Sequence, residues 1–324
     1  MEIIDKDYFF VLTYDFELVP YTQTKGMYEF NAIAGKNRIH FFINNKLDPT
    51  IAIYGHEKTF GLLKMIQIEG ECFAKKSDIN IDNIRSFYSE ICLLGYDIVE
   101  TCSNEKYNFE YETALRQAGY LRPVGQFSMT ATKIIDLTTE IKYHQNWKRN
   151  LKKSSQNELV FEPVDNPEII DCSDFIAIYQ EMISRKSLSS SFSIEQIFSL
   201  CKNGDFKMFF VSTNQQRIAG IIVHQRKIHA GLLYAATNKL ALQKSASFFM
   251  YNELFKYLNM NGFTSFDMEK LVPSTLPINN VFIFKNGIVG NIIQLNGEWS
   301  WYRKSYLRPM MYFVKKYLMK KKEL

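Results

Sequence analysis

The chain has 324 residues, 46% of them apolar and 23% charged, which is the composition of a globular protein long enough to form two cores. It contains no run of about 18 apolar residues, and residues 1–6 lack the basic and then apolar order of a signal peptide, so we expect a cytoplasmic protein. The 5 cysteines include no CxxC pair and the 5 histidines show no metal-ligand spacing, so we expect reduced thiols, no metal site and no tightly bound cofactor.

The net charge of +5 is concentrated at the C-terminus. Residues 303–324 carry +7, which leaves −2 for residues 1–302. The cations are interleaved with apolar residues, a pattern typical of an amphipathic helix that lies on an anionic membrane face or holds a polyanion. A solvated terminal helix docked by its apolar stripe would give the same pattern. The nearly neutral body argues against a broad nucleic-acid-binding face.

Hydrophobic periodicity predicts the elements in chain order. The first half is expected to contain strands at 27–34, 38–43, 50–54 and 63–69, a helix at 81–94, a strand at 96–100, a helix at 107–118 and a strand at 125–135. The second half is expected to contain a strand at 158–163, helices at 169–183 and 194–201, strands at 206–213, 217–224 and 228–236, and a helix at 245–259. A strand at 264–268, a short helix or turn at 278–286 and a terminal hairpin of 291–295 with 299–302 complete it.

Two helices end in a Gly followed by an aromatic residue, with a strand after it: Gly119-Tyr120 and Gly262-Phe263. Each pair closes a run of strand, helix and strand. The chain therefore reads as two copies of one α/β unit, with a cleft expected between them. His224 and His229 flank a tight turn, so we expect both at the surface.

The order of elements in the second half resembles the GNAT acyltransferase fold. FEYETALRQAGY (109–120) and IIDL (134–137) resemble the end of the first domain in the FemABX family of peptidoglycan aminoacyl transferases, and in related tandem GNAT proteins of envelope polysaccharide pathways. NWKRNLKK (146–153) is similar to the basic helix that joins the two domains in that family. GFTSFD (262–267) and FKNG (284–287) look like its glycine, strand, Asp and Phe-Lys elements.

The sequence also departs from the family pattern. Met268, Glu269 and Lys270 follow the strand Asp where members commonly carry small residues. The helical hairpin with which some members hold tRNA is missing, because no heptad-bearing insertion interrupts the second half. The acceptor pocket and a tRNA-borne donor thus have less support than the fold.

The resemblance implies an α/β (α+β) fold of two tandem GNAT-like domains, each with a mixed, mainly antiparallel sheet flanked by helices. The expected segments are 1–141 and 156–302 for the domains, 142–155 for a basic connecting helix and 303–324 for a basic amphipathic C-terminal helix. The implied activity is transfer of an acyl or aminoacyl group from acyl-CoA or aminoacyl-tRNA to an amine or hydroxyl of an envelope precursor, peptide or sugar. The alternative is a catalytically degenerate scaffold protein of an envelope assembly pathway, favoured if Met268 or aromatic residues plug the cleft.

Three residues are candidates for catalysis. Lys285 follows an aromatic residue on a short helix, and by the resemblance it would face the cleft and neutralise an oxyanion or a diphosphate. Asp267 and Glu269 alternate on a strand, so they are expected on one face, where mutual repulsion would raise one pKa and yield a general base. A solvated lysine, a capping Asp and a surface Glu are the structural alternatives.

Two further sets are candidates for binding. Trp147, Lys148, Arg149 and Lys152, with Lys153 beside them, form a basic helix suited to a nucleotide diphosphate or lipid-linked diphosphate, and Tyr302 joins this set. A solvent-exposed charged face is the alternative. Residues Gln243, Lys244, Ser245, Ala246 and Ser247 precede the main helix where a CoA pyrophosphate would bind, although no glycine is present.

Overall fold

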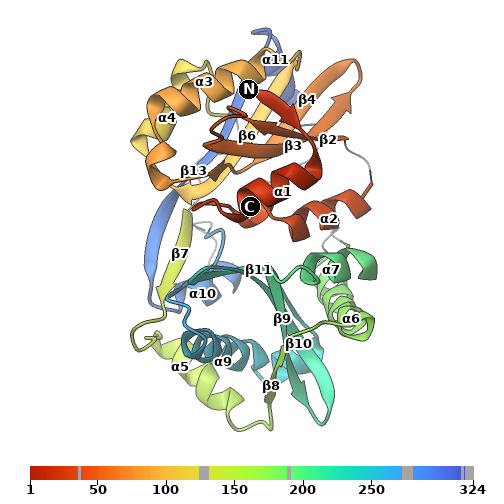
Figure 1. The fold of residues 1–324 in the computed structure, drawn as a ribbon. Helices are drawn as coiled ribbons and strands as arrows, with labels where there is room; N and C mark the ends of the chain where they lie inside the picture. The colour runs from red at the N-terminus through yellow and green to blue at the C-terminus, as the bar shows by residue number, and fades with distance from the viewer. Residues whose placement is uncertain (36–37, 124–130, 188–190, 272–279, 315–316, 318–324) are drawn as a thin grey trace. The chain divides into compact units, whose positions relative to one another are not determined.

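The fold consists of two units that are not consecutive along the chain (Figure 1). The computed structural model describes residues 1–35, 38–123, 131–187, 191–271, 280–314 and 317. Unit 1 contains residues 1–24, 35–131 and 293–324, and unit 2 contains residues 25–34 and 132–292. Both combine a mixed sheet with helices, which confirms the predicted fold class.

The sheet of unit 1 has the order β1-β2-β3-β4-β6-β13. Its strands are β1 (Glu2–Ile4), β2 (Arg38–Ile43), β3 (Ile51–Phe60), β4 (Leu63–Glu69), β6 (Ile98–Lys106) and β13 (Asn291–Tyr302). Neighbouring strands are antiparallel except for β4 and β6, which are parallel. The short β5 (Cys72–Phe73) pairs with β3.

Helices cover both faces of this sheet. They are α1 (Lys6–Tyr14), α3 (Ile81–Cys92), α4 (Phe109–Gln117) and α11 (Leu307–Phe313), with 3-10 turns at Tyr21–Gln23 and Lys76–Asp78. Helices α3 and α4 bury Phe87, Tyr88 and Tyr111 in one core with the sheet. On the other face, Phe9 of α1 packs its ring against Phe41, 5.2 Å between centroids.

The sheet of unit 2 has the order β7-β12-β11-β10-β9-β8. Its strands are β7 (Ala131–Asp136), β8 (Val160–Val164), β9 (Phe206–Thr213), β10 (Gln216–Arg226), β11 (His229–Thr237) and β12 (Ser265–Asp267). Only β11 and β12 are parallel. The pairing order is therefore the same as in unit 1, which confirms the predicted repeat.

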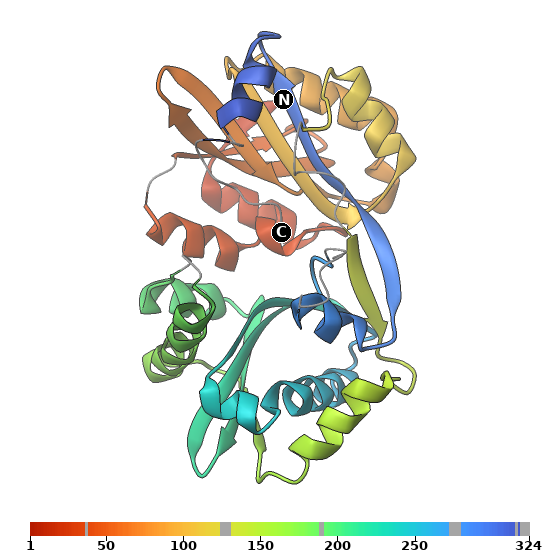
Figure 2. The ribbon, with the colours of Figure 1, turned by 180° about the vertical axis from the view of Figure 1, so that it is seen from behind.

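Seven helices belong to unit 2 within the described residues. They are α2 (Lys25–Ile33), α5 (Gln145–Ser154), α6 (Ile169–Lys186), α7 (Ile194–Cys201), α8 (Lys239–Gln243), α9 (Ala246–Met260) and α10 (Asn280–Asn286). Helix α9 packs on one face of the sheet, and α6 and α7 lie on the other (Figures 1 and 2). The main core lies under α9 and includes Leu254, Phe255 and Leu258.

In each sheet, one of the two end strands in the orders given above comes from the other half of the sequence. Strand β13 pairs with β6 in unit 1, and β7 pairs with β12 in unit 2. The expected boundaries at 141 and 156 are therefore wrong for these strands. The terminal hairpin is also wrong, because 291–302 form one strand that continues through the Asn-Gly sequence, with Asn296 opposite a bulge of β6 at Asn104 and Glu105.

One segment predicted as a strand is a helix. Residues 27–34 mostly belong to α2, whose Met27 and Phe30 are buried three residues apart, a helical spacing. Helix α2 packs on α7 so closely that a Cβ at Gly26 would lie 2.6 Å from the carbonyl oxygen of Leu200. The predicted strand at 125–135 lies partly outside the described residues, which resume at Ala131.

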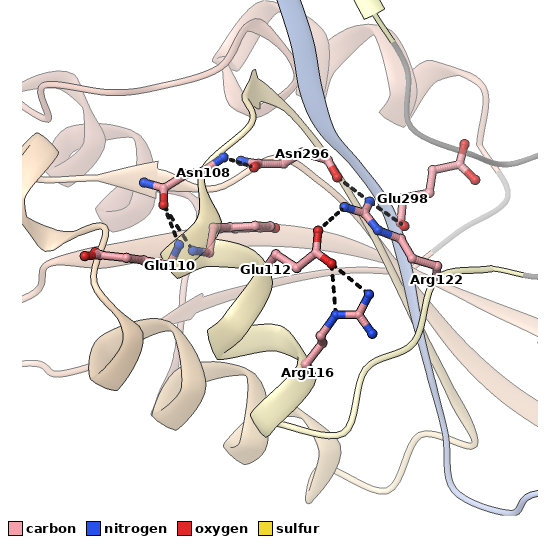
Figure 3. Close-up of polar contacts among 8 residues, drawn as sticks. Asn108, Glu110, Glu112, Arg116, Arg122, Asn296 and Glu298 are labelled. Carbon is pink, nitrogen blue, oxygen red and sulfur yellow. Dashed lines mark hydrogen bonds and ion pairs between the residues drawn. The ribbon is translucent and has the colours of Figure 1, made fainter.

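Arg122 holds β13 in the sheet of unit 1 (Figure 3). Its guanidinium lies 3.7 Å from the ring centroid of Trp299 and donates to the carbonyl oxygen of Asn296. It also forms an ion pair of 2.9 Å with Glu112 of α4. The backbone N–H of Asn108 donates to the side chain of Asn296 at 2.8 Å. Asn296 of β13 is thus bound by the residue that precedes α4 and by the segment that follows this helix.

Candidate active site

A row of paired residues crosses the sheet of unit 2. His224 of β10 pairs with Gly231 of β11, Gly231 pairs with Asp267 of β12, and Asp267 pairs with Ile134 of β7. Directly paired residues place their side chains on the same face. This is the face covered by α6, because a Cβ at Gly220, four residues before His224 on β10, would lie 2.9 Å from Phe175. The polar side chains therefore lie opposite the core under α9.

The pairing of β11 with β12 ends at this row. Strand β12 ends at Asp267, whereas β11 continues past Gly231 to Thr237. Within the described residues, no strand pairs with the rest of β11 on that side. Val223 pairs with Leu232 and Ile222 with Tyr234, so Leu233 is an extra residue that forms a bulge. A bulged residue is left unpaired in the ladder, and bulges are frequent next to active sites.

Asp267 is a half-buried carboxylate with two donors. The hydroxyl of Thr132 and the backbone N–H of Glu269, at 2.7 Å, both donate to its Oδ1. Burial and the nearby Glu269 carboxylate raise the pKa of Asp267 to about 6 from its ordinary value of 3.8, against the effect of these donors and of His224. The group can therefore accept a proton near neutral pH.

Glu269 reaches the same site through a turn. It has a φ of +53°, a left-handed conformation that is unfavourable for a residue with a side chain. Its Oε1 lies 3.4 Å from Nε2 of His224. Glu269 lies close enough to Asp267 to raise its pKa, but this proximity comes from the turn and not from the predicted strand, since β12 ends before Glu269. Strained backbone of this kind is retained where the surrounding structure enforces it.

The ammonium group of Lys285 enforces this turn. It donates to the carbonyl oxygens of Glu269 at 2.6 Å and of Lys270 at 3.1 Å, and the residue is 8% exposed. Burial lowers the pKa of Lys285, and the carboxylates of Glu269 and Asp267 oppose this. Lys133 of β7 in turn donates to the carbonyl oxygen of Ile288 at 2.9 Å, just after α10. The contacts of Lys285 are those of a residue that positions Glu269.

The prediction that Trp147 contacts a substrate is wrong. Trp147 is 2% exposed and stacks on Tyr143 with centroids 4.1 Å apart, with Phe284 on another side. A Cβ at Gly287 would lie 2.7 Å from its ring, so the Phe-Lys-Asn-Gly sequence makes room for it. The indole anchors α5 to the core, because amphipathic packing turns one residue of the basic helix inward.

The cations of α5 lie on its exposed side. Lys148, Arg149, Lys152 and Lys153 are all exposed. Lys148 lines a cavity of about 810 Å³ with Lys142 and Lys256, and an adjoining cavity of about 350 Å³ with Lys152 and Lys256. These grooves run between α5 and α9, on the face of the sheet opposite Asp267.

The residues expected to bind the donor lie where α8 meets α9. Gln243 ends α8, and Ser245 has a φ of +55° directly before α9. Ser245 is 7% exposed, and its hydroxyl makes no capping hydrogen bond. Ala246 and Ser247 begin α9, where backbone N–H groups have no helical acceptor. The side chain of Asn157 donates to the carbonyl oxygens of Lys153, at 3.0 Å, and of Lys244, at 3.3 Å, so the end of α5 lies beside this helix start.

Tyr302 and helix α11 belong to unit 1, whereas the site described above lies in unit 2. Tyr302 belongs to unit 1, where it pairs with Ile98 and packs near Leu307 of α11, because β13 lies in that sheet. Most cations of the predicted helix at 303–324 lie outside the described residues. The part that is described, α11, buries Leu307 and Met311.

His224 is the residue of this site that the sequence reading missed. It was expected at the surface, but its side chain is only 17% exposed, whereas His229 is exposed as predicted. A Cβ at Gly231 would lie 2.1 Å from Nε2 of His224, so the imidazole lies across a glycine. The signal available in the sequence was a glycine seven residues after a histidine, across a predicted hairpin.

No helix in the described part of the chain is long and apolar enough to cross a bilayer. No group of three or more His, Cys, Asp or Glu side chains there could hold a metal ion.

No model of a protein family matches the sequence, and no curated protein matches it. Comparison of the structure found FemX, with a TM-score of 0.73 and 9% identity over 96% of this chain and 100% of that one. L-PGS from Bacillus licheniformis gives a TM-score of 0.61 and 13% identity over 89% and 90% of the two chains. A tandem GNAT protein from the clavulanic acid biosynthesis pathway gives 0.51 and 7% over 83% and 84%. At these identities the likeness establishes the fold.

Proposed function

Starting from a fold shared with FemX, we propose that this protein is an acyl or aminoacyl transferase acting on a cell-envelope precursor, peptide or sugar. The donor is an acyl-CoA or an aminoacyl-tRNA, and the acceptor is an amine or a hydroxyl. The observation that carries the proposal is the Asp267 carboxylate, with a pKa raised to about 6 by burial and Glu269, at the point where β12 leaves the edge of β11 open. The FemABX-like motifs favour an envelope acceptor.

Asp267 is the general base of the proposed reaction. The acceptor nitrogen or oxygen attacks the carbonyl carbon of the donor, and its proton passes to the Asp267 carboxylate. The tetrahedral intermediate collapses as the bond from carbon to the thioester sulfur or the ester oxygen breaks. The leaving group then takes a proton from Asp267, so the carboxylate is regenerated and no other reactant is needed.

The bulge on β11 is the proposed donor of hydrogen bonds to the oxyanion. Leu233 is the extra residue in the ladder, and β12 does not extend alongside it. A preorganised backbone N–H in such a position stabilises developing negative charge, an effect often worth about 3 kcal/mol. Lys285 then contributes indirectly, because its ammonium group holds Glu269 and Lys270.

The start of α9 is the proposed site for the phosphate groups of the donor. Its first backbone N–H groups, the buried Ser245 and the neighbouring Lys244 suit a diphosphate or a terminal nucleotide. Asn157 brings Lys153 beside Lys244, so the basic α5 extends the same positive surface. A cytoplasmic location and a membrane contact through residues 303–324 stay predictions.

One structural feature bears on the alternative of a degenerate scaffold. Met268, which with aromatic residues was expected to plug the cleft in that case, is fully buried in the core under α9. It lies on the opposite face of the sheet from Asp267. The enzyme is thus the better supported of the two functions.

The test combines a search for substrates with one substitution. Wild-type protein is incubated with acyl-CoAs or aminoacylated RNA and with UDP-linked sugar–peptides, and products are detected by mass spectrometry. We expect Asp267→Asn to lower the transfer rate by at least about 100-fold, the usual contribution of a general base. Asp48→Asn, in an exposed loop of unit 1, is the matched control. Full activity of a folded Asp267→Asn protein would refute the assignment.

A further inference from the structure

The face of unit 2 that carries Asp267 holds one more titratable group. His224 lies one strand beyond Gly231, so the glycine separates its ring from the Asp267 position in the same cross-strand row. Glu269 closes this gap from the other side, with its carboxylate 3.4 Å from the imidazole and its backbone N–H on Asp267. Three elements, β10, β12 and the turn after β12, therefore bring three titratable groups together.

The surrounding structure makes this arrangement specific. Any side chain at Gly231 would collide with the imidazole, since a Cβ would lie 2.1 Å from Nε2. The left-handed Glu269 is held by Lys285 through two carbonyl oxygens. An isolated surface histidine needs neither a glycine beneath it nor a strained partner, because water satisfies it.

We infer that His224 is a positioning residue of the proposed transferase: it binds the Glu269 carboxylate and thereby leaves Asp267 to accept the proton of the acceptor. Two neighbouring carboxylates without a cation share one proton, and either can hold it. A cation 3.4 Å from Glu269 would favour the charged form of that carboxylate, which leaves Asp267 as the site for a proton. The catalytic role of His224 rests on the proposed function. The contact of His224 with Glu269, and of Glu269 with Asp267, rests on the geometry alone.

The other charged groups near Asp267 and Glu269 do not replace His224. Lys285 of α10 acts on both carboxylates, but its ammonium group is directed at the carbonyl oxygens of Glu269 and Lys270. Lys133 of β7 is directed at the carbonyl oxygens after α10. His229, the next histidine along the hairpin, is exposed and bonds to the Ser265 hydroxyl at 2.7 Å.

The experiment titrates Asp267 in the full-length protein by NMR, with carboxyl-labelled aspartate and Asp267→Asn to assign the signal. His224→Gln removes the cation, so the two carboxylates share one proton: we expect the first protonation of the pair to move up by about one pH unit, with only part of the change in the Asp267 signal in that step. Glu269→Gln removes the competing carboxylate, and we expect it to lower the same pKa by a similar amount. His229→Gln is the matched control and is expected to leave the titration unchanged.

Gly231→Ala, alone and in the His224→Ala background, controls for effects of misfolding. Gly231→Ala forces the imidazole away, so it should reproduce the titration of His224→Gln. In the His224→Ala background the same substitution should cost little stability, since no ring is left to collide with the new Cβ. An unchanged Asp267 titration in folded His224→Gln and Gly231→Ala proteins would overturn the inference.

The pH dependence of transfer separates this inference from the proposed function. With an active enzyme, the acidic limb of the rate profile should move in the same direction as the NMR midpoint in each variant. An enzyme whose limb stays in place while the NMR midpoint moves would overturn the positioning role. If the expected NMR shifts occur and the wild type transfers no group from any donor tested, the three-residue unit is supported and the proposed function alone fails.

Discussion

Asp267 combines burial with a fixed set of neighbours, and this makes its ionisation costly. The hydroxyl of Thr132 and the N–H of Glu269 stabilise the carboxylate, but removal from water and the Glu269 charge outweigh them. A group of this kind lowers the stability of the folded protein when it ionises, and it is retained where ionisation is useful. The effect can be measured without a substrate.

We predict a pH-dependent stability difference between the wild type and Asp267→Asn. The pKa of Asp267, raised by burial and Glu269, is about 6 in the folded state against an ordinary value of 3.8, so the folded state binds the proton more tightly. The favourable contribution is therefore present below about pH 4 and is lost as pH rises to about 6. Relative to the variant, the wild type should lose about 2 to 3 kcal/mol of unfolding free energy across that range. Parallel curves from urea titrations would contradict the shift.

Removal of Lys285 should disrupt the turn after β12. In Lys285→Ala, the carbonyl oxygens of Glu269 and Lys270 lose a charged donor, so the strained turn should relax and Glu269 should move from His224. We expect transfer to fall at least about tenfold while circular dichroism stays unchanged. Lys239→Ala, an exposed lysine of α8, serves as the control. Wild-type turnover in Lys285→Ala would remove the residue from the mechanism.

Strand β13 is held in its sheet by side-chain contacts in addition to its backbone hydrogen bonds with β6. Arg122 contacts Trp299, Asn296 and Glu112 at once and is only 20% exposed. Arg116 binds the same Glu112 at 2.7 Å but is 56% exposed (Figure 3). The two arginines therefore share a partner and differ in burial, which makes them a matched pair.

We predict that Arg122→Ala destabilises unit 1 by about 2 to 4 kcal/mol, because it removes a cation–π contact and leaves buried acceptors unpaired. Arg116→Ala should cost less than about 1 kcal/mol, as exposed ion pairs do. Hydrogen exchange of the β13 amides, read together with denaturant unfolding, measures both. Equal losses in the two variants would show that Arg122 has no special role in holding the strand.

Local sequence correctly predicts where two of the helices end. Gly119 and Gly262 both have positive φ, and both are followed by an N–H that bonds five residues back, from Tyr120 to Leu115 and from Phe263 to Leu258. The predicted helix ends are thus confirmed. The two helices are nevertheless not equivalent in the repeat. The helix that precedes the parallel strand in unit 1 is α3, and the glycine after it is Gly95, with φ of +89°.

At the scale of the whole molecule, each unit is completed by a strand from the other half of the sequence. A protein truncated after residue 290 lacks β13 and α11, which belong to unit 1. We predict that β6 and α3 of this protein lose protection from hydrogen exchange, because β6 is left with an open edge and α11 no longer covers Ile98. Strands β9 and β10 of unit 2 are the internal control and should stay protected. Intact protection of β6 would mean that β13 is dispensable.

The exchange also affects how the chain can be divided. Fragments cut at the predicted boundary of 141 would separate β13 from its sheet and β7 from its own. The repeat itself was recognised correctly, and the pairing order of the two sheets is the same. A cleft between the repeats stays a prediction.

Apolar periodicity, turn residues and capping glycines, which act over a few residues, were enough to predict the helix ends and the order of strands and helices from residue 158 to residue 268. The fold class was implied by the resemblance to the GNAT and FemABX families. It placed Asp267 and Glu269 together for a reason that proved incomplete, and it took the buried Trp147 for a ligand contact.

The exchange of β7 and β13, the contact of His224 with Glu269 across Gly231 and the strained turn held by Lys285 could not be predicted before the sheets were seen assembled. These contacts join residues that are far apart along the chain. His224 and Glu269 are 45 residues apart, and β6 and β13 lie almost 200 apart, so no local preference encodes their contact. Such pairs form only when whole sheets assemble, and it is in these pairs that the candidate chemistry resides.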